Sequence, residues 1–490
     1  IVGGVLVLIG GVVVGVALGA VRGLARDLPA NGFGLCRGMP GVGSGKAEAL
    51  TPWLHRTLQE LAGRAAGEAP LCFADLDRAG VELRMMTTNL TRRQPTRMPW
   101  PDREYFFDPE TFRRYFPAEV VDWMSRPEHA PELTGGSART WQSRLLRAQA
   151  LPLLPFPAAQ HVPVVVATRM SLSFPVLIAA VPLYAVDYST PPNQKSREVA
   201  RRWHSEHPDG LVEEAAAELE PPVFEPNWFS DGGIASNLPV HFFDTPLPTR
   251  PTFAVDLAPF PPGQKKSDDE LLNSYLPDVN QGGLHRRWIR WDNQGIGSVV
   301  AFGRSILDTA RSWVDQSQLV MPGYRDRIVT IYHDRAEGGM NLTMDSKVVE
   351  DLVARGRGGA TKLVSRFAHD GGWDNHRWIR FRTATAGLDA WLAGFDRGYQ
   401  FPTPSGLQYK QLAGGGADAP LPSYEITQKR RDAVNRRTDA LLTLAAEWRR
   451  DPDDAFTHGA PSPRPVLRLV PGETLDRPSE PGVPFDRNRG

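Results

Sequence analysis

Segments of strand character alternate along this chain with segments of helical spacing, and this alternation limits the folds open to it. The stretches "TFAVDL" (252–257) and "RIVTIYHD" (327–334) are rich in β-branched and aromatic residues, which favour strands. The stretch "DSKVVEDLVARGRGGATKLVSRFA" (345–368) instead carries its apolar residues at helical spacing. We predict a β-branched strand at the start of residues 162–183, followed by an apolar helix or a buried loop. Such alternation predicts an α/β layer architecture.

Further elements follow from local patterns. Leucines at helical spacing predict a helix over residues 51–63, with Thr51 as its N-cap. Residues 81–91 read as a buried strand that leaves into a polar turn. The proline-rich residues 127–163 predict an irregular surface loop, and the polar stretch after Pro262 predicts a mobile one.

Composition excludes several classes of protein. The 490 residues carry 56 basic and 56 acidic side chains, so the chain lacks the basic excess of a nucleic-acid-binding protein. Cys36 and Cys72 are its two cysteines, too few for a disulfide framework or a four-cysteine zinc site. We therefore expect a reducing compartment, the bacterial cytoplasm.

Residues 1–20, "IVGGVLVLIGGVVVGVALGA", contain no charged or polar side chain. About 20 apolar residues span the hydrocarbon core of a bilayer as a helix, and Arg22 and Arg26 follow as positive-inside anchors would. A buried core helix or strand is the alternative interpretation. Membrane association of the protein is thus expected to depend on this segment.

Composition also suggests the domain organisation. The apolar residues 1–30 form a first segment that could span a membrane, and residues 31–400 form one α/β domain. A Pro/Gly-rich linker over 401–425 leads to a helix over 426–450. The proline and charge content of residues 451–490 predicts a disordered tail.

Two familiar kinds of ligand site are not supported by the sequence. The stretch "GMPGVGSGKA" (38–47) fails as a phosphate-binding loop, because Pro40 stands where the first glycine is required and Ala47 where the hydroxyl is required. The histidines His204, His207 and His241 lack further ligands at metal spacing. No calcium-binding loop is evident, so we expect neither a metal nor a cofactor.

The stretch "FSDGGIASNLPVHFFD" (229–244) holds the candidate catalytic residue. A strand that ends near Phe229 would deliver Asp231 to a loop at the edge of the sheet. Gly232 and Gly233 lack the Cβ atoms that would block a tight turn or the close approach of a partner. A carboxylate in this position can accept a proton from a hydroxyl nucleophile. On its own, however, Asp-Gly-Gly is a common turn sequence.

Four segments in this order resemble the patatin-like phospholipases. They are "LRMMTTNLT" (83–91), "VVVATRMSLSFPVLIAAVPL" (164–183), "WFSDGGIASNLPV" (228–240) and "PTFAVDL" (251–257). The resemblance implies a central mixed, mostly parallel sheet with helices on both faces. It also implies hydrolysis of lipid esters by a Ser–Asp dyad, in which the base maps onto Asp231. The family's Gly-x-Ser-x-Gly elbow presents the nucleophile.

This chain departs from the family at the nucleophile. No serine has glycine two residues before and two residues after it; Ser44, Ser137 and Ser230 each fail at one or both positions. Ser171 and Ser173 match a family segment that comes after the elbow, so we interpret them as scaffold or pocket wall. The elbow precedes every matched segment, so we expect it upstream of Ile1, with true loss of the nucleophile as the alternative.

The resulting expectation is a lipid acyl hydrolase whose presented chain has the base but no nucleophile, and which is therefore inactive alone. Its substrate would be a lipid or another acyl ester, and its partners include no nucleic acid. The alternative is a non-catalytic membrane-associated or scaffold protein on a patatin-like fold. The sequence does not specify the ester bond, the oligomeric state or the role of residues beyond 400.

Overall fold

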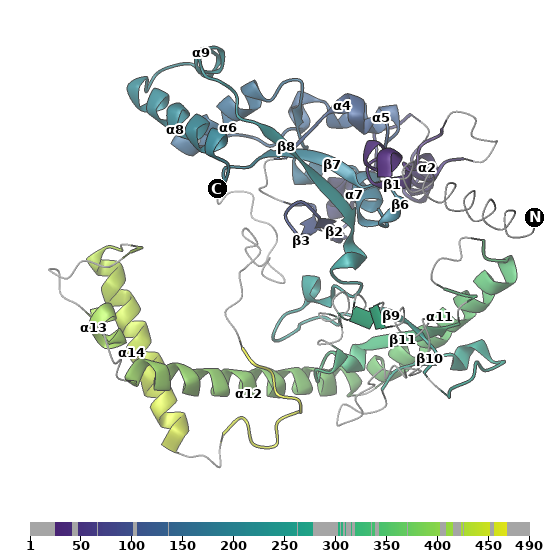
Figure 1. The fold of residues 1–490 in the computed structure, drawn as a ribbon. Coiled ribbons are helices and arrows are strands. Elements are labelled where there is room, and N and C mark those ends of the chain that lie inside the picture. The colour runs from purple at the N-terminus through teal and green to yellow at the C-terminus, as the bar shows by residue number, and fades with distance from the viewer. Residues whose placement is uncertain are drawn as a thin grey trace, which may run out of the picture. The chain divides into compact units, whose positions relative to one another are not determined.

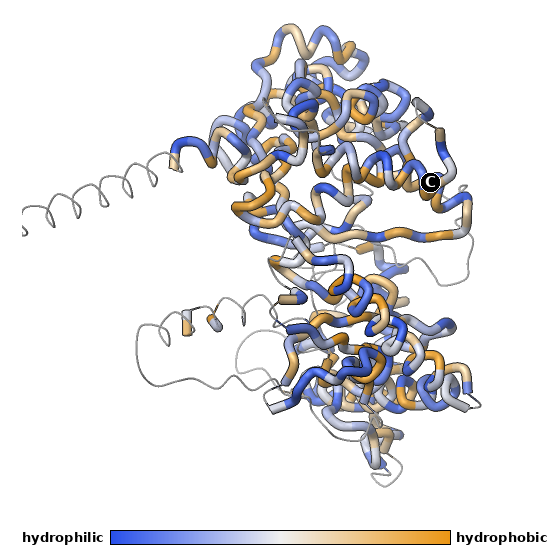
Figure 2. Tube along the Cα trace, turned by 90° about the vertical axis from the view of Figure 1, so that its right-hand side faces the viewer, coloured by the Kyte–Doolittle hydropathy of each residue, from blue (hydrophilic) through white to orange (hydrophobic). Residues whose placement is uncertain are grey.

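The computed structural model describes residues 25–467 with gaps, and it divides them into two compact units. The division falls between Asn237 and Leu238, inside the range assigned above to one domain; that domain assignment stays a prediction. Each unit carries its own hydrophobic stretches (Figure 2). The gaps are residues 42–47, 66, 101–104, 136, 262, 278–301, 304, 307–308, 310–314, 316–318, 335, 339–342, 370, 402–407, 415–422, 425 and 451–454.

The N-terminal unit is built around an antiparallel sheet of six strands in the order β3-β2-β8-β7-β4-β5 (Figure 1). A separate parallel pair joins β1 to β6. The strands are β1 Gly34–Cys36, β2 Met85–Asn89, β3 Gln94–Met98, β4 Phe106–Phe107, β5 Leu154–Pro155, β6 Val176–Ile178, β7 Val181–Val186 and β8 Phe224–Asp231.

Several helices belong to this unit, and one of them, α7, packs on β2 and β8 of the sheet and on α2. They are α2 Leu50–Leu61, α3 Phe73–Arg78, α4 Pro109–Phe112, α5 Ala118–Met124, α6 Ala138–Gln149, α7 Val164–Ser171, α8 Pro191–Glu206 and α9 Val212–Glu218.

The mixed α/β class is as predicted, but the sheet differs from the expected one. Among the described residues the parallel pairings are β1 with β6 and β9 with β11, whereas all pairings of the six-stranded sheet are antiparallel. Short connections explain part of this, since β2 and β3 are joined by a four-residue turn, and a parallel pair needs a crossover of a dozen residues or more.

Three local predictions were wrong in this unit. The β-branched residues 164–166 begin helix α7 rather than a strand, because all three side chains are buried and a continuous apolar run does not distinguish the two. Helix α6 lies inside the segment predicted to be an irregular loop. Helix α2 starts at Leu50 with Ala49 as its N-cap, so Thr51 lies in the first turn, where its side chain is buried.

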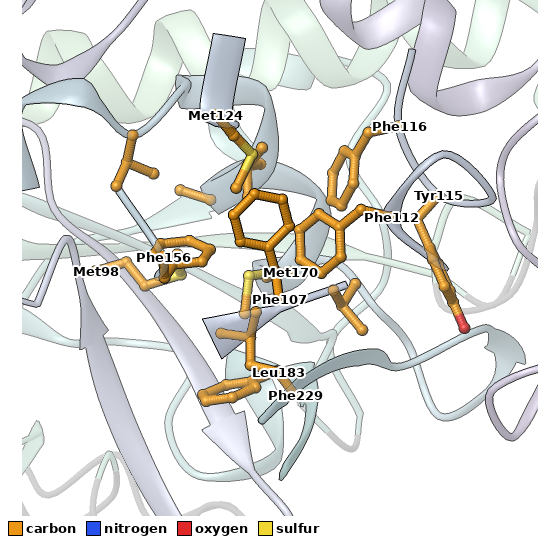
Figure 3. Close-up of a cluster of buried hydrophobic side chains, with 14 of the residues drawn as sticks. Met98, Phe107, Phe112, Tyr115, Phe116, Met124, Phe156, Met170, Leu183 and Phe229 are labelled. Carbon is orange, nitrogen blue, oxygen red and sulfur yellow. The ribbon is translucent and has the colours of Figure 1, made fainter. Parts of the chain in front are cut away.

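The core of the N-terminal unit is rich in aromatic and methionine side chains. Figure 3 shows Phe107, Phe112 and Met170 together with Phe229 of β8 in this cluster. Phe229 is fully buried, so it anchors the end of β8 two residues before Asp231.

The C-terminal unit contains a three-stranded sheet in the order β10-β11-β9, in which β9 and β11 are parallel. Helix α11 packs beside β10 and β11 (Figure 1). The elements are β9 Ala254–Pro259, β10 Ser274–Tyr275, β11 Ile328–His333, α11 Ser346–Phe367, α12 Gly372–Gln400, α13 Tyr409–Gly414 and α14 Gln428–Arg450. Strands β9 and β11 and helix α11 were predicted, whereas the sequence patterns gave no indication of the 29-residue α12.

The segment after Pro262 is tied down by a buried ion network, although a mobile loop was predicted. The fully buried guanidinium of Arg355 donates hydrogen bonds to Glu337 at 2.9 and 3.0 Å and to Glu270 at 2.7 Å. Lys266 lies 3.0 Å from Glu270 and 2.5 Å from Glu337. These carboxylates connect the segment to helix α11 and to the chain after β11.

Within the part of the chain that the structure describes, no helix combines the length and apolar character that crossing a membrane requires. The apolar residues 1–20 lie outside the described residues, so the prediction of membrane insertion is not tested. The same holds for the tail beyond 467 and for most of the linker over 401–425.

Candidate functional site

Asp231 is the last residue of β8, which lies between β2 and β7 in the sheet. It pairs with Thr87 of β2, and its backbone N–H donates a 3.0 Å hydrogen bond to the carbonyl of Ser173, just after α7. The strand predicted to end near Phe229 thus does deliver the acid to a strand end, two residues further on.

The carboxylate of Asp231 is fixed by the turn that follows. Its Oδ1 accepts a 2.8 Å hydrogen bond from the N–H of Gly233, so Asp231 caps the short 3-10 helix Gly232–Ile234. The residue is partly exposed.

Both glycines of the motif make close contacts, Gly232 with backbone and Gly233 with side chains. A Cβ on Gly232 would lie 2.2 Å from the carbonyl oxygen of Met86 in β2. A Cβ on Gly233 would lie 2.4 Å from Oδ1 of Asn237 and 3.2 Å from Oδ1 of Asp231. Gly232 therefore permits close approach of the turn to the sheet, and Gly233 permits close approach of the Asn237 amide to the turn.

Ser173 and Arg169 support this strand end from α7. The hydroxyl of Ser230 donates to the carbonyl of Ser173 at 2.7 Å. The Arg169 guanidinium donates to Ser173 Oγ at 2.5 Å and to the carbonyl of Ala179 at 3.0 Å. Ser173 is thus a buried structural residue, in agreement with its interpretation as scaffold.

Arg169 is the residue that the sequence analysis missed. Its side chain is fully buried, and among the described residues its guanidinium makes no ion pair. Burial without a carboxylate lowers the pKa of Arg169 to about 10, because the charged form loses its hydration. Arg169 therefore supports the candidate site through Ser173, whose carbonyl accepts the hydrogen bond from the Asp231 backbone.

The other sequence candidates lie elsewhere. Ser137 caps helix α6 by accepting from the N–H of Thr140 at 3.2 Å, and Ser44 lies outside the described residues. His204 stacks on Trp141, with ring centroids 4.4 Å apart, and His207 stacks on Trp203. Within the residues that the structure describes, no group of three or more His, Cys, Asp or Glu side chains could hold a metal ion.

The structure brings together three of the four segments that carry the family resemblance. Residues 83–91 contain β2, residues 164–183 contain α7, and residues 228–240 contain the end of β8 with Asp231. Strand β9, from the fourth segment, belongs to the C-terminal unit and pairs with β11.

Comparison with known proteins identifies one informative relative. A protein named RpoH suppressor from Rhizobium meliloti (strain 1021) is 33% identical over 482 residues, which cover 92% of this chain and 72% of the relative. The chain belongs to the RpoH suppressor family. No protein-family model matches this member of the family, and no solved structure matches it.

Proposed function

We propose that this member of the RpoH suppressor family is a lipid acyl hydrolase of the patatin-like type, in which Asp231 is the general base. The observation that carries the proposal is the placement of Asp231 at the end of β8, with its carboxylate held by Gly233. The two other matched segments of the N-terminal unit contribute its neighbours, Thr87 and Ser173.

The chemistry would proceed in two steps, acylation and deacylation. In each step the Asp231 carboxylate accepts one proton and gives it up again, in the second step to the serine oxygen. Asp231 accepts the proton of a serine hydroxyl while the serine oxygen attacks the acyl carbonyl, and the proton then passes to the departing alcohol. Asp231 next activates a water molecule that hydrolyses the acyl-enzyme. The dyad requires no metal and no cofactor. None of the 490 residues is a serine in a Gly-x-Ser-x-Gly elbow, so no serine of this pattern in the chain can be assigned as the nucleophile.

The test compares Asp231→Asn with Asp209→Asn, which changes an exposed aspartate of the same unit in the same way. Both are made in the protein as its gene encodes it, with any residues that precede Ile1 included. General base catalysis accelerates a reaction about 10²–10⁴-fold. Asp231→Asn should therefore lower the turnover of p-nitrophenyl esters by that factor, whereas Asp209→Asn should leave it unchanged. Unchanged turnover in Asp231→Asn would exclude Asp231 as the base.

A non-catalytic role on the same fold is the second candidate, and the lack of an elbow serine in these 490 residues favours it. The gene-encoded protein would then bind lipid or a partner protein without hydrolysis. Failure of that protein to release p-nitrophenol or to react with a fluorophosphonate probe would support this alternative over the hydrolase.

The relative's name adds a cellular role to test. We infer that this chain, like the relative, acts as an RpoH suppressor. Its gene should then complement a Rhizobium meliloti strain that lacks the relative. The Asp231→Asn variant in the same assay would show whether suppression requires hydrolysis.

A further inference from the structure

A groove in the C-terminal unit has the composition of an anion-binding site. It has a volume of about 480 Å³, within the range of small-molecule sites. One wall is strand β10 with the residue after it, and the other is the last two turns of α11. The lining residues are Ser274, Tyr275, Leu276, Thr361, Lys362, Ser365 and Arg366.

The charges in this groove are of one sign. Lys362 and Arg366 are one helical turn apart on α11, and no carboxylate is among the lining residues. Like charges at this spacing repel each other. A bound anion between the two cations would remove that repulsion.

Hydroxyl groups complete the polar surface. Thr361 and Ser365 are also one turn apart on α11, next to the two cations, and Ser274 and Tyr275 face them from β10. Hydroxyl and cationic donors together match the several acceptor oxygens of a phosphate group.

The walls of the groove are fixed by the small core beneath them. Leu276 of one wall and Leu363 of α11 are both buried in the same hydrophobic cluster as Val329. The Lys362 amino group donates a 2.5 Å hydrogen bond to the carbonyl of Ser274, so the two walls are also joined directly.

Arg366 is the cation with the greatest capacity for a ligand. Its Nη1 donates a 3.4 Å hydrogen bond to the carbonyl of Asp326, and the guanidinium makes no ion pair with any described residue. The nearby carboxylate of Asp326 lies 2.7 Å from Nδ1 of the buried His376. A guanidinium placed in this way retains donors for a phosphate oxygen.

We propose that this groove binds the phosphate group of a phosphorylated ligand, either a soluble phosphate ester or a lipid headgroup. Arg366 and Lys362 neutralise the phosphate, and the hydroxyl of Ser365 donates to one of its oxygens. The Thr361 hydroxyl, which donates a 3.0 Å hydrogen bond to the carbonyl of Arg357, reaches a phosphate oxygen by rotating away from that carbonyl. The site is independent of Asp231, so its existence does not depend on the proposed hydrolase activity.

The experiment measures binding to the full chain by two probes. Titration calorimetry with glycerol 3-phosphate tests the soluble source, and flotation with phosphatidylcholine vesicles, with and without phosphatidic acid, tests the lipid source. The variants are Arg366→Gln and Thr361→Ala/Ser365→Ala. The charge-matched control is Arg357→Gln, an exposed arginine of the same helix that does not line the groove. Thermal melting checks that each variant is folded.

A hydrogen bond to a charged group contributes more free energy than a neutral one, so Arg366→Gln should weaken binding about tenfold or more. The double hydroxyl variant should weaken it by a smaller factor, and Arg357→Gln should leave it unchanged. Binding of glycerol 3-phosphate with this pattern supports the soluble source, and binding only to phosphatidic acid vesicles with this pattern supports the headgroup. Absence of binding to both probes, or equal losses in Arg366→Gln and Arg357→Gln, would overturn the proposal.

Discussion

Substitution of Gly232 by alanine is expected to destabilise the N-terminal unit through a collision between the turn after β8 and strand β2. The added Cβ would lie 2.2 Å from the carbonyl oxygen of Met86, although such contacts essentially never fall below 3.0 Å. The turn after β8 must therefore move away from β2 by about 0.8 Å, the difference between these distances. The obstacle is backbone, so no side-chain rotation can relieve it.

The expected loss of stability can be derived from the hydrogen bond that this movement breaks. The hydrogen bond from Thr87 Oγ1 to the carbonyl of Ser230 is 2.7 Å long, and a separation of 0.8 Å would bring it to the limit of hydrogen bonding. Overpacking costs about 1–3 kcal/mol and the lost bond about 1 kcal/mol. The free energy of unfolding should thus fall by about 2–4 kcal/mol. At about 2–4 °C per kcal/mol for a unit of this size, Tm should fall by about 4–16 °C.

Differential scanning calorimetry measures this change, with Gly41→Ala as the control. Gly41 belongs to the same unit, does not have a positive φ, and has no atom within 4 Å of an added Cβ. Its Tm should therefore stay within about 2 °C of the wild-type value, since exposed substitutions rarely exceed ±0.5 kcal/mol. If the Tm of Gly232→Ala equals that of the Gly41→Ala control, Gly232 is not required for the contact between the turn and β2.

Three further predictions rest on other features. Hydrogen bonds from buried Arg355 lower the pKa of Glu337 from 4.5 to about 2, so the stabilisation is present above pH 4.5 and is lost as the pH falls towards 2. The contribution of Glu337 to this loss should be about 3 kcal/mol, so in urea unfolding Glu337→Gln should lose less stability than the wild type over the same window. Gly210→Ala would place a Cβ 2.5 Å from the Trp203 ring, which should lower the stability of the N-terminal unit by about 1–3 kcal/mol in the same assay. Gly233→Ala would meet only a side-chain oxygen at 2.4 Å, so turnover should fall while Tm changes little; equal losses of both would contradict this assignment.

The sequence was informative where chemistry is encoded locally. The position of Asp231 at a strand end could be predicted, because the strand, the acid and the two glycines are consecutive. Helix α6 could have been found as well. Ser137 caps it, and Trp141 and Leu145 follow at helical spacing, but the surrounding prolines suggested a loop.

Interactions between distant residues could not be predicted from local patterns. Arg169 is buried against the carbonyls of Arg37 and Ala179, and an arginine with such partners has no sequence pattern that separates it from an exposed one. The same is true of Glu337 and Glu270, which meet Arg355 from segments 18 and 85 residues away. Their polar character suggested solvent exposure, whereas Arg355 and Lys266 neutralise their charges inside the unit.

The pairing of β2 with β8 has a consequence for how the chain is made. The contact between Thr87 and Ser230 spans 143 residues, a separation that slows folding because a long loop must close first. At translation rates of roughly 5–20 residues per second, β8 emerges roughly 7–29 s after β2. During that interval β2 can pair with β3 on one side only. Its other edge is then exposed to neighbouring nascent chains, so this strand is the point at which slow synthesis or crowded ribosomes would favour aggregation.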